Sequence, residues 1–197
     1  IFEESLVGSI TVGLTWEDFE SGTFSNLPWS FSGNSDWEIV NQSYEGIYAA
    51  ASGSIDDNEV SELNININVT SEEEVTFFYK VSSESSYDYL RFYIDGIEKD
   101  SWSGEIDWSQ ASYTVSTGEH QLRWIYSKDG SVDSGSDMAW VDYIVFPPIG
   151  PPAFPEMDIS VDQLEIIIEN ETHIVPVLVG DAKKCKQLSD KLLNDHN

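Results

Sequence analysis

Apolar and polar residues alternate along most of this chain. Segment 61–69 (SELNININV) places an aliphatic residue at every second position, with polar residues between. Because successive side chains of a strand point to opposite faces, this spacing predicts a strand with one buried face. Segments 74–83, 87–96 and 138–146 are rich in aromatic and β-branched residues, and they predict further strands of the same kind.

Short turn signals separate these segments. Asp95-Gly96 favours a tight hairpin turn, and Thr117-Gly118 divides two more apolar runs. Before residue 180 no stretch shows the pattern of an amphipathic helix. Strands at near-regular spacing with Gly, Ser and Asn turns predict an all-β fold, a two-sheet antiparallel jelly-roll sandwich.

A change in composition follows the last predicted strand. Segment 147–156 holds five of the seven prolines of the chain, which indicates a semi-rigid linker. We therefore expect a domain at 1–147, a linker at 148–156 and a partial β segment at 157–197, whose last residues form a helix-like, lysine-containing tail.

The charge is strongly one-sided. The chain has 36 acidic and 9 basic residues, a net charge of -27, and residues 1–150 carry 27 acidic and 5 basic groups, a net of -22. This field repels phosphate backbones and anionic headgroups, so we expect neither nucleic acid nor membrane insertion. An aromatic-rich composition, with 7 Trp, 9 Tyr and 9 Phe, argues against disorder. The single cysteine, Cys185, excludes a disulfide framework, and the composition favours a secreted or cell-surface protein.

Two acidic residues near the start of the predicted domain need an explanation. In the segment TWEDFESG (15–22), Asp18 and Glu20 would project together from an extended strand while Phe19 projects to the other face. Either a cation sits between these carboxylates, or they form an unoccupied acidic edge in water.

Aromatic residues supply the candidate binding surface. Trp29, Trp37, Trp124 and Trp140 lie within strand motifs and are expected in the core. The candidate ligand-binding residues flank a glycine-containing bend or open the strand after a serine-rich loop; they are Trp102, Trp108, Tyr87 and Tyr89. Exposed aromatic rings stack on sugars or anchor protein contacts, whereas the alternative is that these rings cover the rim of the core.

Catalysis is not expected. The segment GEIDWSQ (104–110) resembles the E-x-D-x-x-E motif of laminarinase-like glycoside hydrolases, the less favoured alternative. Retaining hydrolysis needs two carboxyl groups, and Gln110 at the sixth position cannot transfer the proton. The three histidines are also too scattered to form a catalytic or zinc cluster.

In order along 15–147, the motifs WEDFESG, LPWSFSGNSDWEI, GIYAAASG, HQLRWIYSKD and AWVDYIVFP resemble jelly-roll modules of the MAM and cleaved-adhesin type. The segment that opens PEMDISVDQLEI looks like the first strands of an immunoglobulin-like module. The resemblance implies a non-catalytic accessory module of a secreted or cell-surface multidomain protein, with a glycan or a host or matrix protein as partner. A spacer domain without a ligand is the alternative.

The resemblance also implies a structural calcium ion. In related jelly rolls, including many carbohydrate-binding modules, acidic residues of the first strand and an aspartate of the last strand hold calcium. Asp18, Glu20 and Asp142 match those positions, although many members have a second aspartate where this chain has Tyr143. The next candidates for metal ligands are Asp36, Asp133 and Asp137.

Overall fold

The computed structural model describes residues 16–150. The chain divides into two compact units, 1–153 and 154–197, and the described residues belong to the first. The predicted immunoglobulin-like segment and the tail, 157–197, lie outside the described residues, as does most of the predicted linker.

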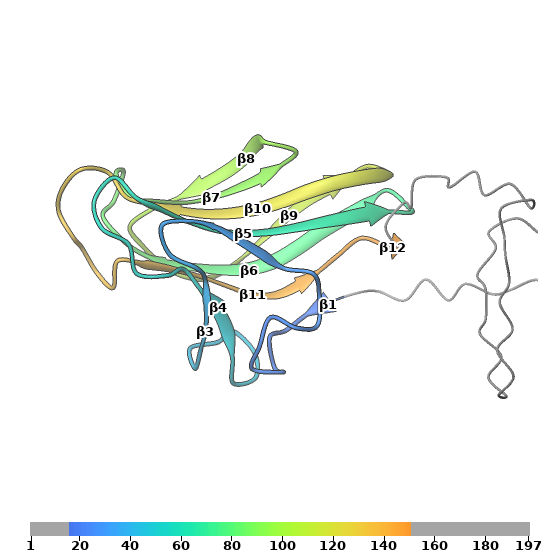
Figure 1. The fold of residues 1–197 in the computed structure, drawn as a ribbon, viewed down its shortest axis with the longest axis horizontal. Coiled ribbons are helices and arrows are strands. Elements are labelled where there is room, and N and C mark those ends of the chain that lie inside the picture. The colour runs from blue at the N-terminus through green and yellow to red at the C-terminus, as the bar shows by residue number, and fades with distance from the viewer. Residues whose placement is uncertain (1–15, 151–197) are drawn as a thin grey trace, which may run out of the picture. The chain divides into compact units, whose positions relative to one another are not determined.

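Two antiparallel sheets form a sandwich (Figure 1). Sheet A contains, in spatial order, β3 (Glu38–Val40), β4 (Ala49–Ala51), β11 (Met138–Val145), β6 (Glu73–Ser82) and β9 (Glu105–Val115), and β1 (Trp16–Glu17) also pairs with β11. Sheet B contains β12 (Ile149–Gly150), β5 (Val60–Val69), β10 (Gly118–Ser127), β7 (Tyr89–Ile94) and β8 (Ile97–Trp102), and β2 (Ser30–Gly33) also pairs with β5. The predicted all-β sandwich is confirmed, and within 16–150 no helix is long and apolar enough to cross a bilayer.

The alternation read from the sequence decides which side chains enter the core. In β5 the predicted aliphatic positions are all buried: Leu63, Ile65, Ile67 and Val69. Asp95 and Gly96 join β7 to β8, with φ angles of 53° and 75°. These left-handed conformations are the ones that a two-residue hairpin turn requires.

The core lies between the two sheets. Phe77 of β6 contacts Phe92 of β7 and Trp124 of β10, with ring centroids 4.8 and 5.3 Å apart. Trp37, Trp124 and Trp140 are buried, and Trp29 packs against the core. The expected core role is confirmed for Trp29, Trp37 and Trp124. Trp140 is buried as well, but it lies outside the core cluster, on the opposite face of β11 from Ala139 and Val141.

The chain differs from expectation where it enters and leaves the sandwich. β1 ends at Glu17, and Phe19 adopts a left-handed φ of 56°. The extended strand expected across Asp18 and Glu20 was therefore wrong, because the backbone turns there. At the other end Ile149 and Gly150, within the predicted linker, pair with β5.

Candidate functional site

Two of the predicted metal ligands, which lie near opposite ends of the domain in the sequence, accept hydrogen bonds from the same loop. We call residues 43–48, between β3 and β4, the 43–48 loop. Glu20 Oε1 accepts hydrogen bonds from the amides of Ile47 and Tyr48 at 2.7 and 2.8 Å. Asp142 Oδ2 accepts from the amides of Tyr44 and Glu45 at 2.8 and 3.1 Å. Glu20 and Asp142 thus meet at the same loop although 122 positions separate them in the sequence.

Asp142 is an unusual carboxylate because it is buried. Only 1% of the residue is exposed, and this burial raises the pKa of its carboxyl group to about 6. The backbone amides of Glu45, Tyr44 and Tyr143 oppose that shift, while the negative charge of Glu20 adds to it. Glu20 and Asp142 are therefore close enough to repel each other.

The third predicted ligand stays with its own turn. Asp18 Oδ1 accepts from the amide of Glu20 at 3.1 Å, which closes the turn after β1. Within residues 16–150, the only group of three acids that can each offer one oxygen within 4.8 Å of the others is a different one: Glu84, Asp88 and Asp129. Asp133 and Asp137, named as further candidates, hold the ammonium group of Lys128 instead.

Sequence reasoning missed the buried Glu17. This side chain is 1% exposed, and its oxygens accept hydrogen bonds from the amide of Phe19 at 3.0 Å and from Trp29 Nε1 at 3.3 Å. Strand alternation is the sequence signal that could have revealed it. Neighbouring side chains of a strand point to opposite faces, and Trp16 is 57% exposed while Glu17 points to the other face.

The four predicted ligand-binding aromatics do not share one surface. Trp102 turns inward and stacks on Tyr79, with ring centroids 4.1 Å apart. Trp108 lies with Tyr44 on the outer face of sheet A, Tyr87 is exposed in the loop between β6 and β7, and Tyr89 lies on the outer face of sheet B. The structure thus separates the residues that the sequence grouped.

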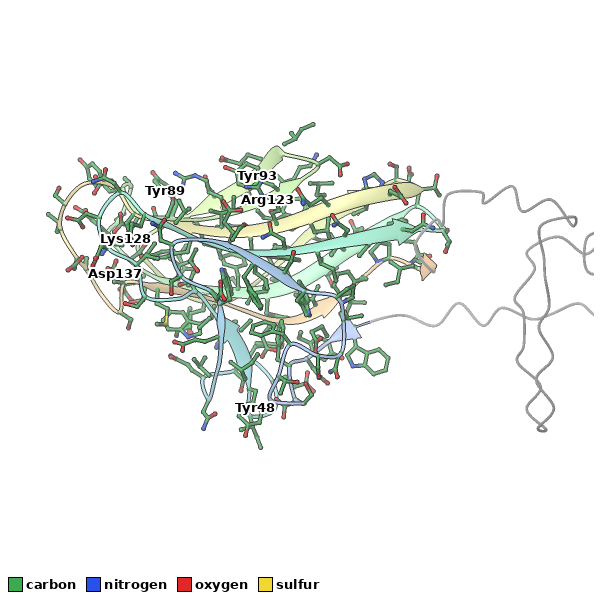
Figure 2. The ribbon with its side chains drawn as sticks, viewed as in Figure 1. Tyr48, Tyr89, Tyr93, Arg123, Lys128 and Asp137 are labelled. Atoms are coloured by element: carbon green, nitrogen blue, oxygen red, sulfur yellow. The ribbon has the colours of Figure 1, made fainter. Side chains whose placement is uncertain are left out.

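A different set of side chains shares the outer face of sheet B. In β7 the residues Tyr89, Arg91 and Tyr93 alternate with buried ones. The guanidinium of Arg91 lies 4.4 Å from the ring centroid of Tyr89, and that of Arg123 in β10 lies 5.5 Å from the ring centroid of Tyr93. Figure 2 shows Tyr93 and Arg123 side by side along this face. We call Tyr89, Arg91, Tyr93 and Arg123 the Tyr-Arg face.

Carboxylates balance the charge of this face. Arg91 Nε lies 3.7 Å from Glu98, and Arg123 Nη2 lies 3.2 Å from Glu62. The hydroxyl of Tyr93 donates to Glu98 at 2.9 Å, and burial together with this bond raises the pKa of Tyr93. The face therefore offers flat rings, donors and acceptors together. The alternating Tyr-x-Arg-x-Tyr of 89–93 was the sequence signal that could have revealed it.

A smaller aromatic group lies on the outer face of sheet A. Tyr44 stacks on Phe78, with ring centroids 3.5 Å apart, and meets Trp108 edge-on at 6.2 Å. Tyr44 belongs to the 43–48 loop, whose position depends on Asp142. The hydrogen bond to Asp142 therefore helps to position the Tyr44 ring against Phe78 and Trp108.

In the segment that resembled a hydrolase motif, Asp107 is not suited to act as a general acid. Asp107 Oδ1 accepts from Lys80 Nζ at 3.0 Å, and this hydrogen bond lowers the pKa of the Asp107 carboxyl group. Glu105 Oε1 accepts from the hydroxyl of Ser82 at 2.8 Å. A general acid in glycoside hydrolysis needs a raised pKa, so Asp107 is unsuited to that role.

Comparison with solved structures finds several chains of similar fold. The K3 cleaved adhesin domain of Lys-gingipain from Porphyromonas gingivalis matches 66% of this chain and 97% of its own length, at 11% identity and a TM-score of 0.51. The secreted serine protease VesC from Vibrio cholerae matches 67% of this chain and 28% of its own, at 21% identity and a TM-score of 0.51. The carbohydrate-binding module TmCBM61, solved with beta-1,4-galactotriose, matches 66% of this chain and 94% of its own, at 20% identity and a TM-score of 0.49. At these identities the likeness concerns the fold alone.

Sequence comparison assigns no family. No family model matches the chain. A curated relative, 5-aminolevulinate synthase of Bradyrhizobium diazoefficiens, is 57% identical over 30 residues, which is 15% of this chain. The chain spans 7% of the length of that relative.

Proposed function

We propose that the sandwich is a non-catalytic module that binds a glycan on its Tyr-Arg face, as part of a secreted or cell-surface multidomain protein. One observation carries the proposal: two tyrosine rings, each with an arginine guanidinium beside it, lie on the outer face of one continuous sheet. Such rings cost little to hold in place on binding, because the sheet and the guanidinium groups already fix them.

The chemistry of this face suits a sugar. Tyrosine rings stack on the apolar faces of pyranose rings, while arginine donors and the acceptors of Glu62 and Glu98 match hydroxyl groups. The strong negative charge of the domain disfavours acidic ligands, so a neutral oligosaccharide is the expected class.

We also propose that calcium binds beside Glu20 and Asp142, with Asp18 adjacent. The repulsion between Glu20 and Asp142 supports this, since a cation between them would remove it. Calcium accepts carboxylate and carbonyl oxygens together, so water or backbone carbonyls would complete the shell around the two carboxylates. When bound, the ion would supply charge neutralisation and would tie the start of the domain to β11.

A glycan array followed by calorimetric titration tests the binding proposal. Tyr93→Ala should weaken binding of the array hit by about tenfold or more, because aromatic anchors dominate binding energy. Tyr89→Ala should have the same direction of effect. Tyr44→Ala, on the opposite sheet, is the matched control and should leave the affinity unchanged.

The other outcomes separate the alternatives. Absence of any array hit would contradict the proposal and favour a spacer domain. A loss of affinity in Tyr44→Ala but not in Tyr93→Ala would move the glycan site to the aromatic group of Tyr44, Phe78 and Trp108 on the outer face of sheet A.

A further inference from the structure

Three acidic residues meet at one end of the sandwich. Glu84 lies in the loop after β6, Asp88 precedes β7, and Asp129 follows β10. The pairing of Tyr89 with Ser127 brings the last two together, and one oxygen from each of the three lies within 4.8 Å of the others.

Asp88 is the buried member of this group. The residue is 0% exposed, and its Oδ1 accepts from the amide of Asp129 at 2.8 Å. Its Oδ2 is buried without a hydrogen-bond partner among the described residues. A buried carboxylate oxygen in that condition is destabilising unless something else coordinates it.

Lys128, the basic side chain next to this group in the sequence, already forms ion pairs. Burial raises the pKa of Asp88, and the charge of Lys128, which precedes Asp129, partly offsets that rise. The ammonium group of Lys128 is nevertheless paired with Asp133 and with Asp137, which Figure 2 labels beside it. Across residues 16–150, no ion pair reaches Glu84, Asp88 or Asp129. Burial first, and then the neighbouring carboxylates, raise the pKa of Glu84, which is the direction expected for uncompensated negative charge.

The surrounding backbone holds these carboxylates in place. The amide of Asp88 donates to the carbonyl of Glu84 at 3.1 Å, and Ser83 Oγ donates to the carbonyl of Asp88 at 2.8 Å. The amide of Ser131 donates to Asp129 Oδ1 at 3.0 Å. The carboxylates of Asp88 and Asp129 are therefore held by backbone amides, and Glu84 is positioned through its backbone carbonyl.

We propose that Glu84, Asp88 and Asp129 bind a calcium ion, at a site separate from that of Glu20 and Asp142. Two oxygens on one calcium ion, each about 2.3 to 2.6 Å from it, can be at most roughly 5 Å apart, and this group meets that limit. Calcium takes about six to eight oxygens, so water or carbonyl oxygens would complete the shell around three carboxylates. Asp88 Oδ2 gains its missing partner in this arrangement.

Calcium titration of the full chain tests the site. After treatment with EDTA and its removal, calcium binding is measured by calorimetry in the wild type, Asp88→Asn, Glu84→Gln and Asp142→Asn. Asp88→Asn should abolish one binding event, and Glu84→Gln should weaken the same event by about tenfold or more. Asp142→Asn should leave this event unchanged, and Glu72→Gln, on an exposed turn, is the matched control.

Thermal melting gives a second readout. In EDTA, Asp88→Asn should melt no lower than the wild type, because the amide removes one of three crowded charges and can donate to its neighbours. In calcium the wild type should melt higher than Asp88→Asn. A calcium titration that neither Asp88→Asn nor Glu84→Gln alters would overturn the proposal. Glu84 is partly exposed, so its variant decides the matter even if Asp88→Asn fails to fold.

Discussion

Trp102 and Trp108 lie only six positions apart in the sequence, yet they pack on different faces of the sandwich. Trp102 ends β8 and packs inward on Tyr79, while Trp108 lies in β9 and packs outward beside Tyr44. The change of sheet at Gly104, which has a left-handed φ of 83°, reverses the side on which a tryptophan meets the core. A residue next to a bend therefore cannot be assigned to surface or core from its neighbours alone.

This contrast predicts unequal effects on stability. Trp102→Ala should lower the free energy of unfolding by about 2 to 4 kcal/mol, because it leaves a cavity beside Tyr79 and Phe77. Trp108→Ala should lower it by less than about 1 kcal/mol. Urea denaturation measures both, and equal losses in the two variants would refute the assignment.

At the residue scale, alternation predicted burial well in strands with one covered face, such as β5 and β7, but not in β11, where a loop covers the outer face as well. The buried aliphatic residues of β5 follow it position by position. It failed at Asp18 and Glu20 because Phe19 adopts a left-handed conformation, after which side chains no longer alternate. The same turn aims Glu20 at the 43–48 loop, a contact that no local sequence pattern encodes.

At the scale of elements, the 43–48 loop depends on carboxylates from both ends of the domain. Glu20 and Asp142 together accept hydrogen bonds from four of its amides. Both acceptors are carboxylates in a strongly acidic protein. The position of the 43–48 loop therefore depends on the charge state of Asp142 in β11.

The proposed calcium ion beside Asp142 should therefore raise the melting temperature. A ligand specific to the folded state contributes about 2.7 kcal/mol at a hundredfold excess over Kd, and each kcal/mol moves the midpoint by roughly 2 to 4 °C in a domain of this size. A shift of roughly 5 to 10 °C between EDTA and millimolar calcium is expected. It is best measured in an Asp88→Asn background, which removes the second proposed site.

Adding Asp142→Asn to that background should abolish the shift. Magnesium is the control, since it demands a tighter octahedral shell and should stabilise less. A calcium shift that persists in the double variant would show that the ion binds elsewhere.

The elements themselves were only partly predictable. Long strands and the Asp95-Gly96 hairpin have local signals, because periodicity and a left-handed turn pair are properties of short segments. Strands of two to four residues, such as β1, β2 and β12, are too short to show a period. Their positions come from pairing with β5 and β11, and sheet order is a property of the folded chain.

At the scale of the whole molecule, excess negative charge opposes compaction. Residues 1–150 carry a net charge of -22, and their five basic side chains can pair with only a minority of the 27 acids. Such self-repulsion destabilises a folded protein.

Salt should therefore stabilise the protein. Raising sodium chloride from about 0.1 M to 1 M shortens the screening length from about 10 Å to 3 Å, and the melting temperature in EDTA should rise by several degrees. Potassium chloride is the control and should act equally. A midpoint that falls with either salt would show that specific ion pairs outweigh the general repulsion.

The chain enters and leaves the sandwich through its two shortest strands, β1 and β12. Trp16 and Glu17 pair with β11 in sheet A, while Ile149 and Gly150 pair with β5 in sheet B. A pulling force applied through residues 16 and 150 would meet these two-residue ladders before the ten-residue ladder between β5 and β10. Each of these ladders has only two residue pairs, so a small displacement of the chain would open it. Under tension the domain would yield first at its attachments, by a short and reversible lengthening, while its inner strands keep their register.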